Sequence, residues 1–143
     1  MPSPPPLTVP DVVGPLVAAV VFVALMSRVK EPTRRTINAI AIAGASGVYL
    51  GGGRGGWELV FAALVATLAY HGLRSYRLIG VGWLLHAAWD LVHHLDGHPI
   101  WPFMPSSSFG CLIFDSAIAL WFLAGAPAVL GGRRRPATAA PGR

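Results

Sequence analysis

Residues 109–130 read FGCLIFDSAIALWFLAGAPAVL, an apolar run in which Asp115 is the single charged side chain. An α-helix of about 20 apolar residues crosses the roughly 30 Å hydrocarbon core of a lipid bilayer. Inside that core each segment must satisfy its own backbone hydrogen bonds, which favours helices over isolated strands. This stretch is therefore typical of a membrane-spanning helix.

Four further apolar runs precede this one, and short polar loops separate them. They cover residues 12–27, 37–53, 57–73 and 78–95. We predict an all-α fold, namely a polytopic transmembrane bundle of about five helices that forms one domain over residues 11–131. A Pro-rich disordered tail (residues 1–10) is expected before it, and a basic disordered tail (residues 132–143) after it.

The composition agrees with a membrane protein. Of the 143 residues, 54% are hydrophobic and 12% are charged, and the mean hydropathy is +0.58. A soluble domain carries about 25% charged residues, because it must cover its core with a hydrated surface. The net charge of +5 comes from short basic clusters between the apolar runs. They form no basic stripe with interleaved aromatic residues, which argues against a nucleic-acid partner. We expect a multi-pass protein of the cell membrane, with the lipid bilayer as its partner.

The basic residues also predict an orientation. Ten of the eleven Lys and Arg residues lie in the first loop, the third loop and the C-terminal tail, and Arg54 is the exception. Loops rich in Lys and Arg stay in the cytoplasm, so we predict that the N-terminus is outside and the C-terminus inside. Gly47 and Gly51 have the spacing that lets helices approach closely. This spacing is compatible with a central helix or with a homo-oligomer.

Chemically informative residues gather in residues 83–98, which read WLLHAAWDLVHHLDGH. At about 100° per residue, Asp90 lies roughly 40° from His86 around a helix, and His93 and His94 lie at about −20° and 80°. All four side chains thus share about a third of the helix surface. Asp115 is expected at a depth similar to that of Asp90, because each lies five or six residues from the outer end of its run.

These residues predict a polar pocket in the outer half of the bilayer, with Glu58 near its edge. Ionisable groups in lipid are unfavourable unless they are paired, and they mark functional pathways. We take Asp90, Asp115 and His86 as candidate catalytic residues. The candidate ligands of a divalent metal such as Zn²⁺ are His86, Asp90, His93 and His94. A hydrogen-bonded plug that only joins two helices is the structural alternative.

Three stretches of the chain, WLLHAAWDLVHH, PIWPFMPSSSFGC and IFDSAIALWF, resemble a family of small bacterial integral membrane proteins of unknown function. The likeness covers about a third of the chain. It implies a membrane-embedded domain, and it implies no activity. The His and Asp content is also loosely similar to the hydrolase superfamily that includes alkaline ceramidases and progestin receptors. Those proteins have seven helices and a different motif order, so this second likeness is an analogy.

Three functions are compatible with these observations. The first is a membrane-embedded enzyme, a metal-assisted hydrolase or isomerase that acts on a lipid-like small molecule. The second is a small proton-linked transporter in which the same residues relay protons. The third is an accessory or scaffold subunit in which the polar residues serve assembly alone.

Overall fold

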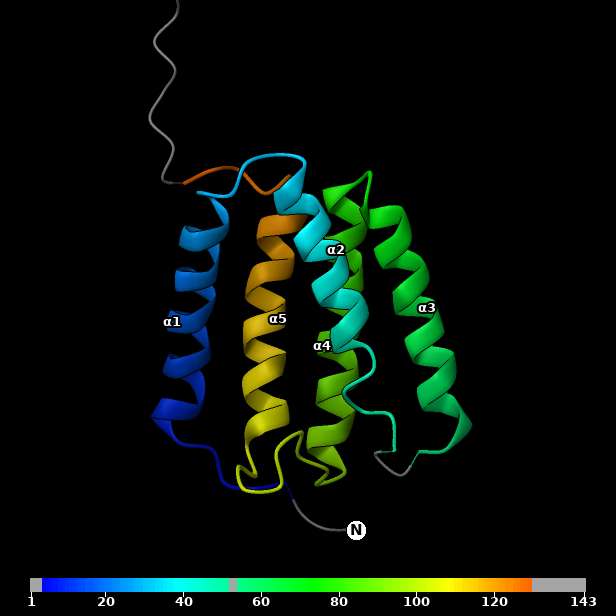
Figure 1. Ribbon diagram of the computed structural model, residues 1–143. Coiled ribbons are helices and arrows are strands. Elements are labelled where there is room, and N and C mark those ends of the chain that lie inside the picture. Colours follow the sequence, from blue (N-terminus) through cyan, green and yellow to red (C-terminus); the bar gives the residue numbers. More distant parts are fainter. Residues whose placement is uncertain (1–3, 52–53, 130–143) are drawn as a thin grey trace, which may run out of the picture.

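The computed structural model describes residues 4–51 and 54–129, and over these residues the chain forms five α-helices and no β-strand (Figure 1). The all-α prediction is thereby confirmed. The helices are α1 (Val9–Met26), α2 (Thr33–Ala45), α3 (Gly56–Gly72), α4 (Tyr76–Leu95) and α5 (Ser107–Leu123).

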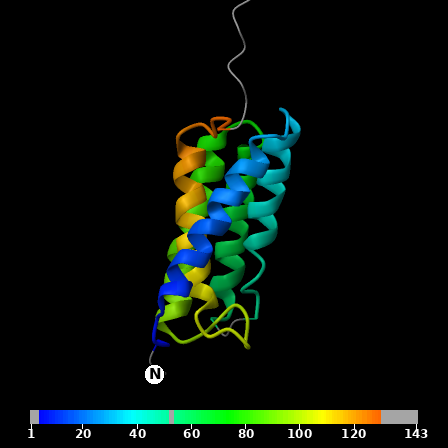
Figure 2. The same cartoon turned by 90° about the vertical axis from the view of Figure 1, so that its left-hand side faces the viewer.

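The helices lie side by side along one axis, and helices that follow each other in sequence run in opposite directions (Figure 1). Helix α4 is central, because it packs against α5, α3 and α2. Helix α1 lies at one edge of the bundle and packs chiefly against α5 (Figure 2). The loops after α1 and α3 lie at one end of the bundle, and the loops after α2 and α4 lie at the other.

A glycine allows the tight packing of α4 against α5. A Cβ atom at Gly80 would lie 2.9 Å from Cγ of Leu123, 3.0 Å from the Leu123 backbone nitrogen and 3.1 Å from the Ala119 carbonyl oxygen. The first of these contacts could shift with the side chain, but the other two are with backbone atoms. Only glycine therefore lets the two backbones approach this closely.

Helix α1 is long and apolar enough to cross a membrane, and it is the only helix of the described residues that meets both criteria. Helix α5 is apolar but shorter. Large apolar side chains point outward on several helices, as Val20 (69% exposed), Leu59 (65%) and Leu120 (66%) illustrate. Several polar side chains point inward instead, among them Asn38, Glu58, His86, Asp90, His93 and Asp115.

Helix α2 ends at Ala45, well before the predicted end at residue 53. The chain continues as turns through residue 51, and residues 52–53 lie outside the described part. The sequence from Gly44 to Gly56 is rich in glycine, which is about 1 kcal/mol less favourable than alanine in a helix. Gly51 has φ of +95°, a conformation that other residues rarely adopt. The apolar run is continuous here, but the helix is not.

Helix α5 also ends early, at Leu123 instead of residue 130. Gly125 has φ of +90°, its N–H donates to the Phe122 carbonyl, and the Ala126 N–H donates to the Trp121 carbonyl. This is a Schellman motif, in which a glycine closes the helix and satisfies its last carbonyl groups. The apolar residues after it, up to residue 129, therefore do not extend the helix.

The first helix begins at Val9, inside the predicted tail of residues 1–10. Asp11 explains this start, because its carboxylate accepts a hydrogen bond from the Thr8 backbone N–H at 2.7 Å and caps the helix. Residues 1–3 of the predicted tail lie outside the described residues. The predicted basic tail, residues 132–143, lies outside them as well.

Candidate functional site

A buried cluster of ionisable side chains joins α4 to α5. His86 and Asp90 lie one turn apart on α4, and Asp115 faces them from α5. Nδ1 of His86 lies 2.8 Å from Oδ2 of Asp115 and 3.3 Å from Oδ2 of Asp90. The exposed fraction is at most 3% for each of the three residues. The expected closeness of the two carboxylates is thereby confirmed, and His86 is the group that bridges them.

The other imidazole nitrogen of His86 is held by α2. Nε2 lies 2.9 Å from the carbonyl oxygen of Ala45, the last residue of that helix. A carbonyl oxygen can only accept a hydrogen bond, so Nε2 must carry the hydrogen. Nδ1 then faces the two carboxylates either as the lone-pair nitrogen of a neutral ring or as the second N–H of a cationic one.

Two chemical states satisfy this geometry. In the first, one proton is shared between Nδ1 and Asp115, so that the ring is cationic or the carboxyl group is protonated. In the second, a cation lies between Nδ1 and the carboxylate oxygens. A histidine that ligates a metal almost always donates its other ring N–H to a carbonyl or carboxylate oxygen, as His86 does here. The fixed tautomer therefore suits both a proton-holding site and a metal site.

The distances allow a metal ion. Among the described residues, one set of three candidate ligand atoms converges, and these atoms lie within 4.8 Å of one another. They come from His86, Asp90 and Asp115. Imidazole nitrogen with carboxylate oxygen is a ligand set of zinc and other divalent transition metals.

Tyr49 completes the cluster from the turns after α2. Its hydroxyl donates a hydrogen bond to Oδ1 of Asp90 at 2.7 Å, and the residue is 5% exposed. The ring also stacks on His93, with 3.8 Å between the ring centroids. The sequence interpretation missed Tyr49, because it placed this residue within a continuous helix. The signal was available, since Tyr49 is the one hydroxyl-bearing aromatic residue in a stretch rich in glycine and alanine.

The predicted ligand set is His86, Asp90, His93 and His94, and of these His93 and His94 do not belong to the converging set. His93 shares the helix face of His86, but seven residues separate the two, a rise of about 10 Å along α4. Its Nδ1 atom lies 3.0 Å from the Trp89 carbonyl oxygen. His94 turns toward Phe109 instead, with 5.2 Å between the ring centroids. Both side chains share a helix face with the cluster. His93 differs from it in its depth along α4, and His94 differs in the direction in which it points.

Glu58 is buried near the start of α3 and has a local role. Its carboxylate accepts hydrogen bonds from the backbone N–H groups of Gly51 (2.7 Å) and Arg54 (3.1 Å). It thereby fixes the connection between α2 and α3. The sequence interpretation placed Glu58 near the edge of the pocket, and these two contacts connect it to the turns after α2.

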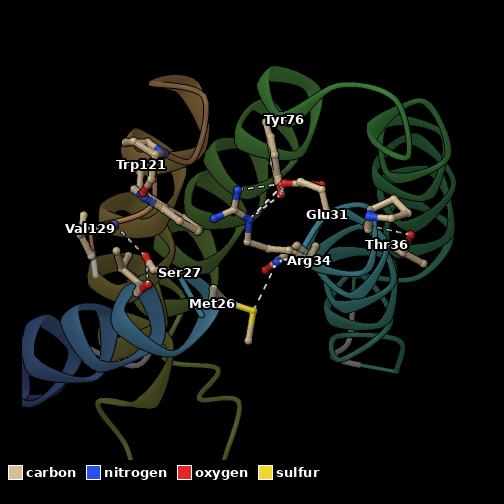
Figure 3. A network of polar contacts seen from close by, with 12 residues as sticks. Met26, Ser27, Glu31, Arg34, Thr36, Tyr76, Trp121 and Val129 are labelled. Atoms are coloured by element: carbon tan, nitrogen blue, oxygen red, sulfur yellow. Dashed lines mark hydrogen bonds and ion pairs between the residues drawn. The ribbon is translucent and has the colours of Figure 1, made fainter. Parts of the chain in front are cut away.

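A second polar network lies at the opposite end of the bundle. Arg34 lies between Glu31 and Tyr76, with its Nε atom 2.9 Å from the Tyr76 hydroxyl and its Nη2 atom 2.9 Å from Oε1 of Glu31 (Figure 3). Tyr76 also donates a hydrogen bond to Glu31. Partial burial acts to raise the pKa of Glu31, but hydrogen bonds from Tyr76 and Arg34 outweigh it and hold the pKa below its ordinary value. The network joins the loop after α1 to the start of α4.

No curated protein and no solved structure matches this chain significantly. A protein family matches residues 10–128, a range that includes all five helices apart from the first residue of α1. The match thus includes the turn that carries Tyr49 as well as His86, Asp90 and Asp115. The chain belongs to the family of unknown function DUF6010.

Proposed function

We propose that this protein is a multi-pass protein of the cell membrane. The apolar length of α1 supports this, and so do the large apolar side chains that face outward on several helices. Buried charges with exposed leucine and valine are the reverse of the usual pattern in a soluble protein. Helix α2, at 13 residues, covers only about 20 Å, so the turns up to residue 51 would complete that crossing.

The arrangement of the loops supports the predicted orientation. The loops after α1 and α3 lie at one end of the bundle (Figure 1), and with the start of α2 and α4 they hold Arg28, Lys30, Arg34, Arg35, Arg74 and Arg77. Arg54 lies at the opposite end, beside Asp96, with which it forms an ion pair. The positive-inside rule then places the first end in the cytoplasm and the N-terminus outside. The His86–Asp90–Asp115 cluster would lie in the outer half of the bilayer.

We propose further that the cluster is the catalytic site of a metal-assisted hydrolase that acts on a lipid-like substrate. One observation carries this proposal. The Ala45 carbonyl fixes the hydrogen of His86 on Nε2, and Nδ1 meets one oxygen of each carboxylate in a buried space. Three protein ligands would leave a coordination position for water, as in catalytic zinc sites.

The chemistry follows from that ligand set. When bound, a divalent ion would lower the pKa of a water molecule beside it and supply a nucleophile for the hydrolysis of an ester or amide. His86, Asp90 and Asp115 would hold the ion. Tyr49 would orient the Asp90 carboxylate through its hydrogen bond. The substrate would be lipid-like because the site lies among membrane-spanning helices.

Elemental analysis of the purified protein in mild detergent tests this proposal. Wild type is expected to hold about one divalent ion per chain, whereas His86→Ala and Asp115→Asn are expected to lose it. His71→Ala is the matched control, because His71 is exposed on α3 and lies outside the converging set. Metal-free wild type that stays metal-free after incubation with Zn²⁺, Mn²⁺ or Fe²⁺ would rule out the metal site.

A proton-linked transporter is the second candidate, and the short contact between His86 and Asp115 favours it. At 2.8 Å these groups share a proton without any ion, and Tyr49, Asp90, His86 and Asp115 then form a continuous hydrogen-bonded chain. Such chains carry protons in pumps and transporters. Proton uptake into liposomes by metal-free protein, abolished in Asp115→Asn, would favour this candidate over the hydrolase.

A further inference from the structure

A cavity of about 540 Å³ lies between α1 and α5, outside the polar cluster. Its volume falls in the range of small-molecule binding sites. Residues from the first half of α1, the first half of α5 and the loop between α4 and α5 line it.

The lining changes from polar to apolar along the helices. Asp11 and Ser106 lie at the end where α1 and α5 begin, and Ala18 and Phe114 lie further along. Ser106 donates a hydrogen bond to Oδ1 of Asp11 at 2.5 Å. Thr8 donates two hydrogen bonds to the other carboxylate oxygen, from its backbone N–H and its hydroxyl. Oδ1 therefore retains a lone pair for a further donor.

Two glycines leave this space open. A Cβ atom added at Gly14 would meet nothing within 4 Å, and one added at Gly110 would touch only Cγ of Pro15, at 3.4 Å. Glycine within a helix is about 1 kcal/mol less favourable than alanine. Close helix packing explains Gly80, but nothing is packed against Gly14. Its lack of a side chain contributes open volume instead.

The cavity adjoins the polar cluster through Cys111. Cys111 lines the cavity, and it lies one helical turn before Asp115 on the same side of α5. A molecule in the cavity would thus extend along α5 toward the His86–Asp90–Asp115 site. Cys111 is also the only cysteine of the chain, so a thiol reagent reports on this wall alone.

We propose that the cavity binds the hydrocarbon chain of a single-chain lipid whose head group carries hydrogen-bond donors, such as the hydroxyls of a monoacylglycerol. The apolar part would take the hydrocarbon chain, and Asp11 would accept a hydrogen bond from the head group. A lipid with a carboxylate head is disfavoured, because its charge would face that of Asp11. This inference goes beyond the proposed function: with the head group at Asp11 and the hydrocarbon chain directed along α5, it assigns a lipid-binding site beside the cluster.

Labelling of Cys111 tests the proposal without a need for activity or metal. The full chain in phosphatidylcholine nanodiscs is treated with N-ethylmaleimide, and the single adduct is followed by mass spectrometry. We expect 1-monolauroylglycerol to slow labelling at least tenfold, and laurate at the same concentration to leave the rate within twofold. Equal rates with and without monolauroylglycerol, equal protection by laurate, or no labelling of wild type would each overturn the proposal.

Two leucine variants add a steric test. Gly14→Leu is expected to slow labelling without added lipid, because its side chain fills the cavity. Gly44→Leu is the matched control, since a Cβ atom added at this exposed helical glycine also meets nothing within 4 Å and Gly44 lies outside the cavity. Unchanged labelling in folded Gly14→Leu would contradict the proposal. If Gly14→Leu does not fold, protection by monolauroylglycerol in wild type decides alone.

The same assay separates this inference from the proposed function. Asp115→Asn is expected to lose the metal and still show protection of Cys111 by monolauroylglycerol. Metal binding without such protection would refute the lipid cavity and leave the metal site standing. Protection of Cys111 in a wild type that binds no metal would refute the metal site and leave the lipid cavity standing.

Discussion

The hydroxyl of Tyr49 donates a hydrogen bond at 2.7 Å to Asp90, a residue that lies 41 positions away in the sequence and is 0% exposed. The contact holds the turns after α2 against the centre of α4. It also satisfies an oxygen of a carboxylate that is removed from solvent. An unsatisfied buried polar group costs about 1–3 kcal/mol, so this contact matters for stability as well as for the site.

We predict that Tyr49→Phe lowers the stability of the protein by about 1–3 kcal/mol, because Asp90 loses this donor. It should also weaken any metal binding by about 10- to 100-fold, the usual effect of losing an outer partner of a ligand. Thermal unfolding in detergent and metal titration measure the two effects. Tyr70→Phe is the control, since Tyr70 is 65% exposed. Equal unfolding midpoints for Tyr49→Phe and wild type would contradict the structural role of the contact.

Neutral isosteric variants separate function from packing. Asp90→Asn and Asp115→Asn keep the shape of the side chains and remove their charge, and we expect them to insert at normal abundance but to lose activity. Positioned proton transfer alone contributes about 10²- to 10⁴-fold to a rate. The growth or lipid profile of a strain that lacks the protein serves as the readout. His93→Gln is expected to retain function, since His93 lies outside the converging set. Full rescue by both Asn variants would leave a purely structural role.

Gly80→Ala should destabilise the bundle by about 1–3 kcal/mol, because the new methyl group would meet backbone atoms of α5. Gly44→Ala is the matched control. A Cβ atom there meets nothing within 4 Å, so the higher helix propensity of alanine should leave stability equal or higher. Unfolding midpoints of the two variants measure the difference. The same midpoint for both would show that α4 and α5 are not held at the distance described.

Reporter fusions test the orientation. A reporter at the C-terminus is expected to indicate a cytoplasmic location. A reporter inserted at Phe103, an exposed residue of the loop between α4 and α5, is expected to indicate an exterior location. The expectation follows from the ten Lys and Arg residues on the predicted inner side against one on the other. Both reporters on the same side of the membrane would refute the crossing by α5, and with it the predicted orientation.

The Glu31 network predicts a pH dependence at the other end of the bundle. The pKa of Glu31 is lower in the folded protein than its ordinary value, so its ionised form stabilises the fold. That contribution is present above the ordinary pKa of about 4.3 and is lost as the pH falls through the lowered value. Glu31→Gln should thus be less stable than wild type at pH 7, and the difference should shrink below about pH 4. A difference that does not change with pH would contradict this linkage.

Helical periodicity was sufficient to predict part of the site. His86 and Asp90 are four residues apart, so any helix through this stretch brings them to one face. The depth of Asp115 followed from its position in the next run. Periodicity predicts the direction in which a side chain points around its own helix. It does not predict which residues of a neighbouring helix lie at the same depth. For that reason the predicted ligand set contains His93 and His94, whereas the side chains that converge in the structure are His86, Asp90 and Asp115.

Tyr49 and the Ala45 carbonyl could not be predicted in the same way. Both depend on the end of α2 within an apolar run, and hydropathy alone does not mark that end. The glycines after Ala45 are visible in the sequence, but their spacing equally predicts close helix packing. A backbone carbonyl leaves no trace in the sequence at all, because every residue carries one.

The early end of α2 has a consequence for how this family can change. A longer α2 would be more helical, and replacing Gly47 or Gly51, which follow the end of the helix, by alanine would favour it by about 1 kcal/mol per residue. The Ala45 carbonyl accepts the Val48 N–H as well as the Nε2–H of His86. In an extended helix the Tyr49 N–H would replace that of Val48, and the Tyr49 side chain would leave the position in which it contacts Asp90. Helicity in this segment and assembly of the site are thus opposed, a trade-off between stability and activity. Selection for stability alone would be expected to remove these glycines, so their retention among relatives would be a measure of selection on the site.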